Sequence, residues 1–420
     1  MEDMRLAIQK VNQAVITLGG RGTRLKEITN DIPKPLWPVL GTSCLERCVK
    51  NLINFGIDNF IFLVGYKENL FEKEATTLFN KYGIKISINK ENFPRGEAGA
   101  LIDVITSLEN KFLFINGDII FNLDFNKLFE FDFINNSDLT FTTHTTTHPY
   151  DSDCIIENPS LGIFDHKFKD NKNGNPSFFL GNAGISLVSK KVVEFVSNSI
   201  DKKKELSFFK DFIIFANKNK FNVFSYNTSE YMFDMGTPKR LIKVEKDLKN
   251  KLVFKKSYVN PQKALFLDRD NTLIKCKKGS YICAREQIDI FKERIIKLAN
   301  IGEQFDLIII VSNQPQISMG LTDWQRVINI NGELINNCLN FGLKISCFYI
   351  CPHHPHRGFN NEILNLKSNC FCRKPNPGMF LEASFKRNIN LSKSLMIGDS
   401  IADKKAALNA SLDFKWIDSI

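Results

Sequence analysis

The chain has 420 residues, which is more than a single hydrophobic core usually spans, so we expect two domains. Its hydrophobic content of 43% is typical of a soluble globular protein, and no apolar run approaches the roughly 18 residues that a membrane helix needs. Because the N-terminus also lacks the apolar stretch and the small-residue cleavage site of a signal peptide, we expect a cytoplasmic protein.

The net charge of +10 is compatible with nucleic acid, an anionic membrane or small phosphorylated molecules as partners. The lysines are spread along the chain, and no aromatic-basic RNA motif or recognition-helix pattern occurs, so we expect neither a nucleic-acid nor a membrane partner. Small-molecule substrates are the expected partners, and the oligomeric state stays open. Ten cysteines in a cytosolic chain of this length indicate packing or metal binding rather than a disulfide framework.

Strand-like and helix-like segments alternate along the first part of the chain. Residues 11–18 form a β-branched apolar run that ends in glycines, as a buried strand feeding a phosphate loop does. This order predicts an α/β domain with a parallel, doubly wound, Rossmann-like sheet that carries helices on both faces. The further predicted elements are helices at 44–55, 70–82 and 98–108 and strands at 60–64, 84–88 and 112–115.

A second α/β series follows a charged amphipathic helix predicted at 241–256. It begins with a strand at 264–267 and continues with strands at 307–311, 345–350 and 395–397. We therefore expect a first domain over 1–245, a linker over 246–262 and a second doubly wound domain over 263–420.

The first predicted strand ends in a glycine-rich loop, Gly19-Gly20-Arg21-Gly22-Thr23-Arg24. Glycine lets the backbone approach phosphates with its N–H groups, and Arg24 would add a cationic fork. The loop is neither a Walker loop nor a dinucleotide fingerprint, so on its own a simple strand-to-helix turn explains it equally well. Two acids further along, Asp118 and Asp234, could hold a divalent ion against two phosphates.

Six motifs in order make residues 11–242 similar to the sugar-1-phosphate nucleotidylyltransferase family. They are Gly19 to Leu25, Pro33-Lys34-Pro35-Leu36, Gly96-Glu97-Ala98-Gly99-Ala100, Gly117-Asp118, Asn182-Ala183-Gly184 and Asp234-Met235-Gly236-Thr237-Pro238. The resemblance implies in-line attack of a sugar 1-phosphate on the α-phosphorus of a nucleoside triphosphate, with release of pyrophosphate. The implied residues are Gly19, Gly20, Gly22, Thr23 and Arg24 for the triphosphate, Lys34 for the transferring phosphate, Asp118 and Asp234 for Mg²⁺, and Gly99 and Asn182 for substrate.

A second set of motifs begins where the predicted strand 264–267 ends, with Asp268-Arg269-Asp270-Asn271-Thr272. Together with Ser312-Asn313-Gln314, Arg373-Lys374-Pro375 and Gly398-Asp399-Ser400, it makes residues 263–418 resemble the haloacid dehalogenase phosphatases. Asp268 would attack phosphorus, and Asp270 would protonate the leaving oxygen and later activate water. The implied partners are Ser312 and Lys374 for the phosphoryl oxygens, Asp268, the Asp270 carbonyl and Asp399 for Mg²⁺, and Arg269, Asn313 and Arg373 for substrate, with Asp403 outside the metal ligands.

Cysteine and histidine pairs at Cys351-Pro352-His353 and Cys370-Phe371-Cys372 could close a tetrahedral structural Zn²⁺ site. His353 is the ligand by family position, although spacing alone leaves His354 open, and free buried cysteines are the alternative. The loop is similar to that of the heptose 1,7-bisphosphate 7-phosphatases and of the related histidinol phosphatases.

The two resemblances together favour consecutive reactions on one sugar. Removal of a 7-phosphate leaves heptose 1-phosphate, which is the type of acceptor that the first domain needs. We therefore expect a bifunctional enzyme of GDP-heptose biosynthesis that hydrolyses heptose 1,7-bisphosphate and transfers GMP from GTP to the product. Two alternatives stay open: a mannose or glucose 1-phosphate transferase joined to a histidinol-phosphatase-like domain, and one degenerate domain acting as a scaffold.

Overall fold

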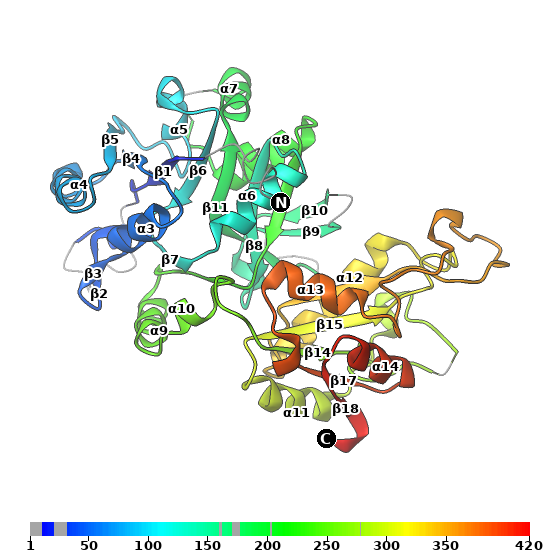
Figure 1. Ribbon diagram of the computed structural model, residues 1–420. Helices are drawn as coiled ribbons and strands as arrows, with labels where there is room; N and C mark the ends of the chain where they lie inside the picture. The colour runs from blue at the N-terminus through cyan, green and yellow to red at the C-terminus, as the bar shows by residue number, and fades with distance from the viewer. Residues whose placement is uncertain (1–10, 21–31, 159–161, 170–176, 202–203, 278) are drawn as a thin grey trace. The chain divides into compact units, whose positions relative to one another are not determined.

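The structure is a computed structural model of the chain that describes residues 11–20, 32–158, 162–169, 177–201, 204–277 and 279–420 (Figure 1). The chain divides into two compact units, which we describe separately. The first consists of Met1–Thr143 and Asn182–Ser257, and the second of His144–Gly181 and Tyr258–Ile420. Within the described residues, no helix combines the length and the apolar character needed to cross a membrane.

The first unit is built on a sheet whose central strands have the order β11-β6-β1-β4-β5. The parallel order predicted from the sequence is confirmed for β6, β1, β4 and β5, whereas β11 runs antiparallel to β6. Beyond β11 the sheet continues with β8, which pairs in parallel with β12. The strands are β1 (Gln13–Thr17), β4 (Asn59–Val64), β5 (Lys85–Lys90), β6 (Lys111–Asn116), β8 (Leu139–Thr145), β11 (Leu180–Ser189) and β12 (Val223–Asn227).

Helices cover both faces of this sheet, because alternate strand residues point to opposite sides. On one side, Ala14 and Ile16 share a core with apolar residues of α3 (Cys44–Ile53), α4 (Glu68–Tyr82) and α6 (Phe125–Ile134). On the other side, Phe114 of β6 stacks on Phe208 with 4.3 Å between ring centroids. Phe208 opens a π-helical segment, Phe208–Ile214, that leads into α8 (Phe215–Lys218), and α7 (Lys190–Ser199) completes the helices of this region.

Two predicted helices of the first unit are interrupted. The helix expected at 98–108 is α5 (Ala100–Asp103) followed by a 3-10 turn at Ile105–Ser107, because Val104 between them leaves helical geometry with ψ near 9°. The helix expected at 241–256 is α9 (Pro238–Lys249) and α10 (Leu252–Lys255), separated at Lys251 with φ +57°. Two ribbons complete the unit: β2 (Pro38–Val39) with β3 (Thr42–Ser43), and β7 (Ile119–Asn122) with β13 (Tyr231–Asp234).

The second unit contains a five-stranded parallel sheet of order β16-β15-β14-β17-β18, which confirms the predicted α/β fold. The predicted strands at 264–267, 307–311 and 395–397 appear at these positions, and the strand expected from 345 begins two residues later. The strands are β14 (Ala264–Leu267), β15 (Leu307–Asn313), β16 (Cys347–Cys351), β17 (Leu395–Gly398) and β18 (Asp413–Trp416). The helices are α11 (Lys292–Gly302), α12 (Trp324–Asn340), α13 (Gly378–Arg387) and α14 (Ile401–Asn409).

The second unit also contains a segment from the N-terminal half of the chain, residues 144–181, which we call the hairpin segment. It carries the antiparallel strands β9 (Cys154–Asn158) and β10 (Gly162–Lys167). Apolar side chains of its described part, among them Ile156 and Phe178, share a small core with Ile328 of α12 and Phe348 of β16. The side-chain amide of Asn336 on α12 donates to the Phe178 carbonyl at 3.0 Å.

Candidate active sites

Four neighbouring parallel strands of the first unit deliver polar groups to one edge of its sheet. Gly19 follows β1, Gly65 follows β4, Glu91 follows β5, and Asp118 lies just after β6. The carboxyl ends of parallel strands meet at the same edge, which is where open α/β sheets bind ligands. The structure therefore places the glycine loop and the first predicted metal ligand on one edge.

The ribbon of β7 and β13 brings the two predicted acids of the first site together. Asp234 is paired with Ile119, the residue after Asp118, and the Met235 N–H donates to the Asp118 carbonyl at 3.0 Å. Burial raises the pKa of Asp118, an effect that the Lys34 ammonium opposes and the Asp234 carboxylate reinforces. This pair of adjacent carboxylates beside a cation fits a divalent metal that binds phosphates.

Arg240 is part of this site and has no counterpart among the predicted residues. Its Nη1 donates to both carboxylate oxygens of Asp234, at 2.9 and 3.0 Å, and the Gly236 N–H donates to the same carboxylate at 2.8 Å. These contacts fix the orientation of Asp234. Arg240 lies six residues after Asp234, in the first turn of α9, and the turn between β13 and α9 brings the two side chains together.

The Glu91 carboxylate lies against the glycines. A Cβ added to Gly19 would lie 3.3 Å from Glu91 Oε2, and one added to Gly65 would lie 3.2 Å from the same oxygen. Burial raises the pKa of Glu91, and nearby Arg95 opposes this shift. Glu91 was not among the predicted site residues, because a single acid before a motif carries no pattern of its own.

Some of the other predicted residues of the first site lie within the described part of the chain, and some lie outside it. Gly22, Thr23 and Arg24 lie outside the described residues, whereas Lys34 is half-buried in a 3-10 turn at Lys34–Leu36. Gly99 begins α5, and a Cβ there would lie 2.3 Å from the Arg95 carbonyl oxygen, so the turn requires glycine. Asn182 lies on β11, where its side-chain oxygen accepts from the Gly184 N–H at 3.3 Å.

The second unit gathers its predicted nucleophile, lysine and acids at the carboxyl edge of its sheet. Lys374 is 5% exposed, and its Nζ lies 2.6 Å from Asp268 Oδ1, 2.5 Å from Asp403 Oδ1 and 2.9 Å from the Val311 carbonyl oxygen. Burial raises the pKa of Asp268, and the Lys374 ammonium opposes this effect. One buried cation thus holds two buried carboxylates, which keeps the nucleophile next to the group expected to bind phosphoryl oxygens.

Carboxylate oxygens of Asp268, Asp399 and Asp403 lie within 4.8 Å of one another, which is close enough to share one metal ion. Asp403 is held on its other oxygen, because Oδ2 accepts from the Ser400 backbone N–H at 3.1 Å and from the Ser400 hydroxyl at 2.6 Å. Gly398 makes room for this acid, since a Cβ there would lie 2.7 Å from the Asp403 Cβ. The donor set consists of carboxylates, as Mg²⁺ prefers.

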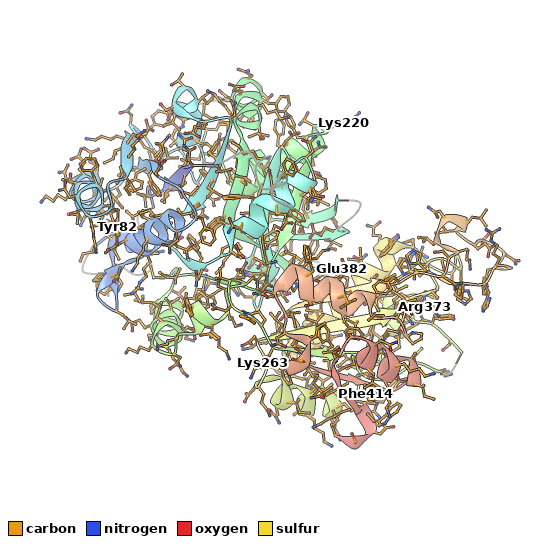
Figure 2. The ribbon with its side chains drawn as sticks, in the orientation of Figure 1. Tyr82, Lys220, Lys263, Arg373, Glu382 and Phe414 are labelled. Carbon is orange, nitrogen blue, oxygen red and sulfur yellow. The ribbon has the colours of Figure 1, made fainter. Side chains whose placement is uncertain are left out.

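Two residues predicted to bind substrate, Asn313 and Arg269, make contacts with other residues of the second unit. Asn313 exchanges hydrogen bonds with the backbone of Lys374, at 3.0 Å in both directions, and thereby positions the lysine. Arg269 is 0% exposed, and its guanidinium contacts Asp270 and Asn331. Arg373 remains half-buried with Nη1 donating to the His353 carbonyl at 3.1 Å, and Figure 2 shows it far from Lys263, which precedes β14.

The four predicted zinc ligands lie close together at the end of β16. One ligand atom each from Cys351, His353, Cys370 and Cys372 lie within 4.8 Å of one another, and the Cys372 sulfur lies 3.3 Å from His353 Nδ1. Hydrogen bonding with Cys351, Cys370 and His353 lowers the pKa of Cys372 to about 5, which favours the thiolate form that binds metals. His354 Nδ1 instead lies 3.1 Å from both the backbone nitrogen and the carbonyl oxygen of His356. The geometry therefore groups His353, and not His354, with the three cysteines.

Comparisons with known proteins match the two halves of the chain separately. The nucleotidyl transferase family model matches residues 13–251, and the polynucleotide kinase 3 phosphatase model matches residues 263–419. The chain is 29% identical to D-glycero-alpha-D-manno-heptose 1-phosphate guanylyltransferase of Aneurinibacillus thermoaerophilus, over 57% of this chain and 99% of that protein.

The C-terminal half has its own relatives. The chain is 33% identical to D-glycero-beta-D-manno-heptose-1,7-bisphosphate 7-phosphatase of Photorhabdus laumondii, over 36% of this chain and 78% of that protein. Among solved structures, HddC from Yersinia pseudotuberculosis matches 57% of this chain and 100% of its own, with 26% identity and a TM-score of 0.48. The chain thus belongs to the nucleotidyl transferase family through residues 13–251 and, through its C-terminal half, to the haloacid dehalogenase-type phosphatase family of the heptose bisphosphate phosphatases.

Proposed function

We propose that the chain is a bifunctional enzyme of GDP-heptose biosynthesis. The second unit would hydrolyse the 7-phosphate of D-glycero-D-manno-heptose 1,7-bisphosphate, and the first would transfer GMP from GTP to the resulting heptose 1-phosphate. The observation that carries this proposal is the presence, on one chain, of two halves whose relatives act in consecutive steps on one sugar. The relatives of the C-terminal half include heptose 1,7-bisphosphate 7-phosphatases named for the β and for the α anomer, and those of the N-terminal half include the α-heptose 1-phosphate guanylyltransferase. Because the 1-phosphate keeps its configuration through both steps, we assign the α anomer of the guanylyltransferase relative.

In the proposed phosphatase reaction, Asp268 is the nucleophile. Its carboxylate attacks the phosphorus of the 7-phosphate, so that an aspartyl phosphate forms as the P–O7 bond breaks, and Asp270 gives its proton to O7. A water that Asp270 deprotonates then attacks the aspartyl phosphate, which releases inorganic phosphate and restores Asp268. Lys374 and Ser312 would hold the phosphoryl oxygens. Mg²⁺, bound by Asp268, Asp399 and the Asp270 carbonyl, would neutralise charge on the phosphoryl group.

The zinc assignment rests on the donor set at the end of β16. Three thiols and one imidazole within 4.8 Å are ligands that Zn²⁺ binds in closed tetrahedral sites. Bound there, Zn²⁺ would tie Cys351 to the segment of Cys370 and Cys372, and so fix the start of the loop that delivers Arg373 and Lys374. We assign the site a structural role, because all four positions are filled by protein ligands.

The nucleotidyl transfer would place the nucleotide along the carboxyl edge of the first sheet. Asp118 and Asp234 would hold Mg²⁺ against the phosphates, with Lys34 beside them. Glu91 follows β5, and its carboxylate reaches back along the edge to Gly65 and Gly19, which follow β4 and β1. A nucleotide with its phosphates at Asp118 and its base at Glu91 would lie against Gly19.

A carboxylate at the base position favours guanine over the other common bases. Guanine presents two adjacent donors, N1–H and N2–H₂, which can bond both oxygens of one carboxylate, as in other two-point carboxylate contacts. Adenine and cytosine each pair a donor with an acceptor along that edge, and uracil and thymine offer one donor between two acceptors. Glu91 beside Gly19 and Gly65 therefore supports GTP as the substrate.

The test is incubation of the full chain with Mg²⁺, GTP and heptose 1,7-bisphosphate, with phosphate, pyrophosphate and sugar nucleotide followed by mass. We expect GDP-heptose from the wild type. Asp268→Asn should form it only from heptose 1-phosphate, and Asp118→Asn should accumulate heptose 1-phosphate and phosphate. Glu91→Gln should lower kcat/KM for GTP about 100-fold by leaving one guanine donor facing an amide N–H.

Competing substrates make the proposal refutable. Mannose 1-phosphate and glucose 1-phosphate should be poor acceptors, and histidinol phosphate a poor substrate for the second unit. A preference for any of them over the heptose would replace the sugar assignment. Phosphate release without a sugar nucleotide from any of the four common triphosphates would indicate that the first unit is degenerate.

A further inference from the structure

The Asp270 carboxylate is bonded on both oxygens by protein side chains. Arg269 donates to Oδ1 from Nε at 3.1 Å and from Nη2 at 3.0 Å, and Nη2 also lies 3.1 Å from Oδ2. Gln314 Nε2 donates to Oδ2 at 2.9 Å. A short acid side chain would otherwise rotate freely about two bonds, so these contacts restrict where its oxygens lie.

A tight turn makes the contact between these two successive residues possible. The Leu273 and Ile274 N–H groups both bond the Arg269 carbonyl, at 2.9 and 3.1 Å. Asn271 within the turn adopts a left-handed conformation with φ +58°. In an extended strand, neighbouring side chains would point to opposite faces, and the turn removes this constraint.

Arg269 is anchored from its other side by α12. Its Nη1 donates to the side-chain oxygen of Asn331 at 3.0 Å, and both residues are 0% exposed. A fully buried guanidinium cannot reach a substrate, so the role of Arg269 lies in these internal contacts. Arg269 therefore connects Asn331 of α12 to the Asp270 carboxylate through hydrogen bonds.

The second donor to Asp270 is fixed by a buried amide next to it. Gln314 Oε1 accepts from Gln316 Nε2 at 2.5 Å, so the Nε2 group of Gln314 is the end that faces Asp270 and the Ser312 hydroxyl. All three of Gln314, Gln316 and Ser312 are buried. The orientation of this donor thus depends on a residue outside the predicted catalytic set.

We propose that Arg269 and Asn331 are positioning residues that hold Asp270 for proton transfer to the leaving oxygen. The proposal rests on the proposed phosphatase activity of the second unit. In the step concerned, the P–O bond to the alcohol breaks while the Asp270 proton moves to the departing oxygen. A misplaced Asp270 slows the reaction of alkyl phosphates, whose alkoxide cannot leave without a proton. An aryl phosphate with a stable leaving anion does not need that proton.

The experiment compares two substrates in the full chain loaded with Mg²⁺. One is the alkyl sugar phosphate that the wild type hydrolyses fastest, and the other is p-nitrophenyl phosphate. Asn331→Leu removes the acceptor for Arg269 at nearly constant volume, and Arg269→Lys keeps the charge but loses the fork. We expect kcat/KM for the sugar phosphate to fall about tenfold or more in both variants, within the range of a general acid's contribution. The kcat/KM for p-nitrophenyl phosphate should change less than about twofold, because kcat/KM does not include the later hydrolysis of the aspartyl phosphate, in which Asp270 also acts.

The control is Asn340→Leu, at the exposed end of the same helix, which should change neither rate. Thermal unfolding and the Mg²⁺ concentration for half-maximal activity, measured for each variant, separate misfolding and metal loss from misplacement of Asp270. Equal losses on both substrates, or no loss on either, would overturn the positioning role. A wild type that hydrolyses no phosphate ester would overturn the proposed phosphatase, and the positioning role with it.

Discussion

Gly332, in the middle of α12, provides a test of whether the hairpin segment docks on the phosphatase fold. Glycine inside a helix costs about 1 kcal/mol relative to alanine, so Gly332→Ala would stabilise an isolated α12 by about that amount. In the structure, however, a Cβ at this position would lie 2.1 Å from the Ser177 carbonyl oxygen and 2.9 Å from Phe179 Cδ1. Ordinary contact begins at 3.4 Å, and a backbone carbonyl cannot rotate away as a side chain can.

The expected change in the docking free energy follows from the contacts that the added methyl group would displace. Overpacking of this kind costs about 1–3 kcal/mol, and withdrawal of the segment would also strain the hydrogen bond from Asn336 to the Phe178 carbonyl, worth about 1 kcal/mol. After subtraction of the gain in helix propensity, docking of the hairpin segment should weaken by about 1–3 kcal/mol. Gly332→Ala should therefore be stabilising if nothing covers the glycine, and it should destabilise the docked segment if the segment lies against α12.

Native-state proteolysis at Lys167 measures this free energy, because Lys167 is buried at the end of β10 and is accessible to a protease only when the segment opens. At a factor of ten for each 1.4 kcal/mol, trypsin should cut after Lys167 about 5 to 100 times faster in Gly332→Ala than in the wild type. Asn340→Ala, at the exposed end of α12, should change the rate less than about threefold. Slower cleavage in Gly332→Ala than in the wild type would show that nothing covers the glycine and would refute the reasoning.

Three further predictions concern the sites themselves. Lys374→Met should abolish phosphatase activity and lower the stability of the second unit by about 3–5 kcal/mol, because two buried carboxylates lose their cation. Calorimetry measures this loss, and an unchanged thermal unfolding transition would contradict the prediction. Gly96→Ala should reduce nucleotidyl transfer by at least about tenfold with phosphatase activity intact, since Gly96 has φ +73° and its Cβ would lie 2.7 Å from the Leu206 carbonyl oxygen. Cys372→Ser, or a zinc chelator, should lower phosphatase activity and release about one zinc per chain by metal analysis, with nucleotidyl transfer unaffected.

Much of the fold could be predicted from local pattern. The strands that begin at Ala264 and Leu307 were expected at these residues, because a fully buried parallel strand is a short, continuous apolar run that the sequence displays directly. The antiparallel direction of β11 and the grouping of residues 144–181 with the second unit were not expected. Both depend on which distant segments pair or pack, and no periodicity within a segment encodes that choice.

In the candidate sites too, some residues could be predicted from the sequence, whereas their contacts could not. Asp268, Lys374 and the four zinc-type ligands stood in recognisable motifs, because their chemistry requires particular residue types at fixed spacings along the chain. Arg269 stood in a motif too, but the sequence could not show that its side chain turns inward to Asp270 and Asn331.

The sequence by itself determined the residue types that can carry each reaction and the order of the two α/β units. Only the tertiary structure decided which neighbours orient them, as with Asn331 on Arg269, Arg240 on Asp234 and Glu91 against the glycines. The physical reason is that an orienting contact needs only a donor or an acceptor within about 3 Å. Many residue types meet that requirement, so the position is set by the packing of elements remote in the chain and leaves no motif behind.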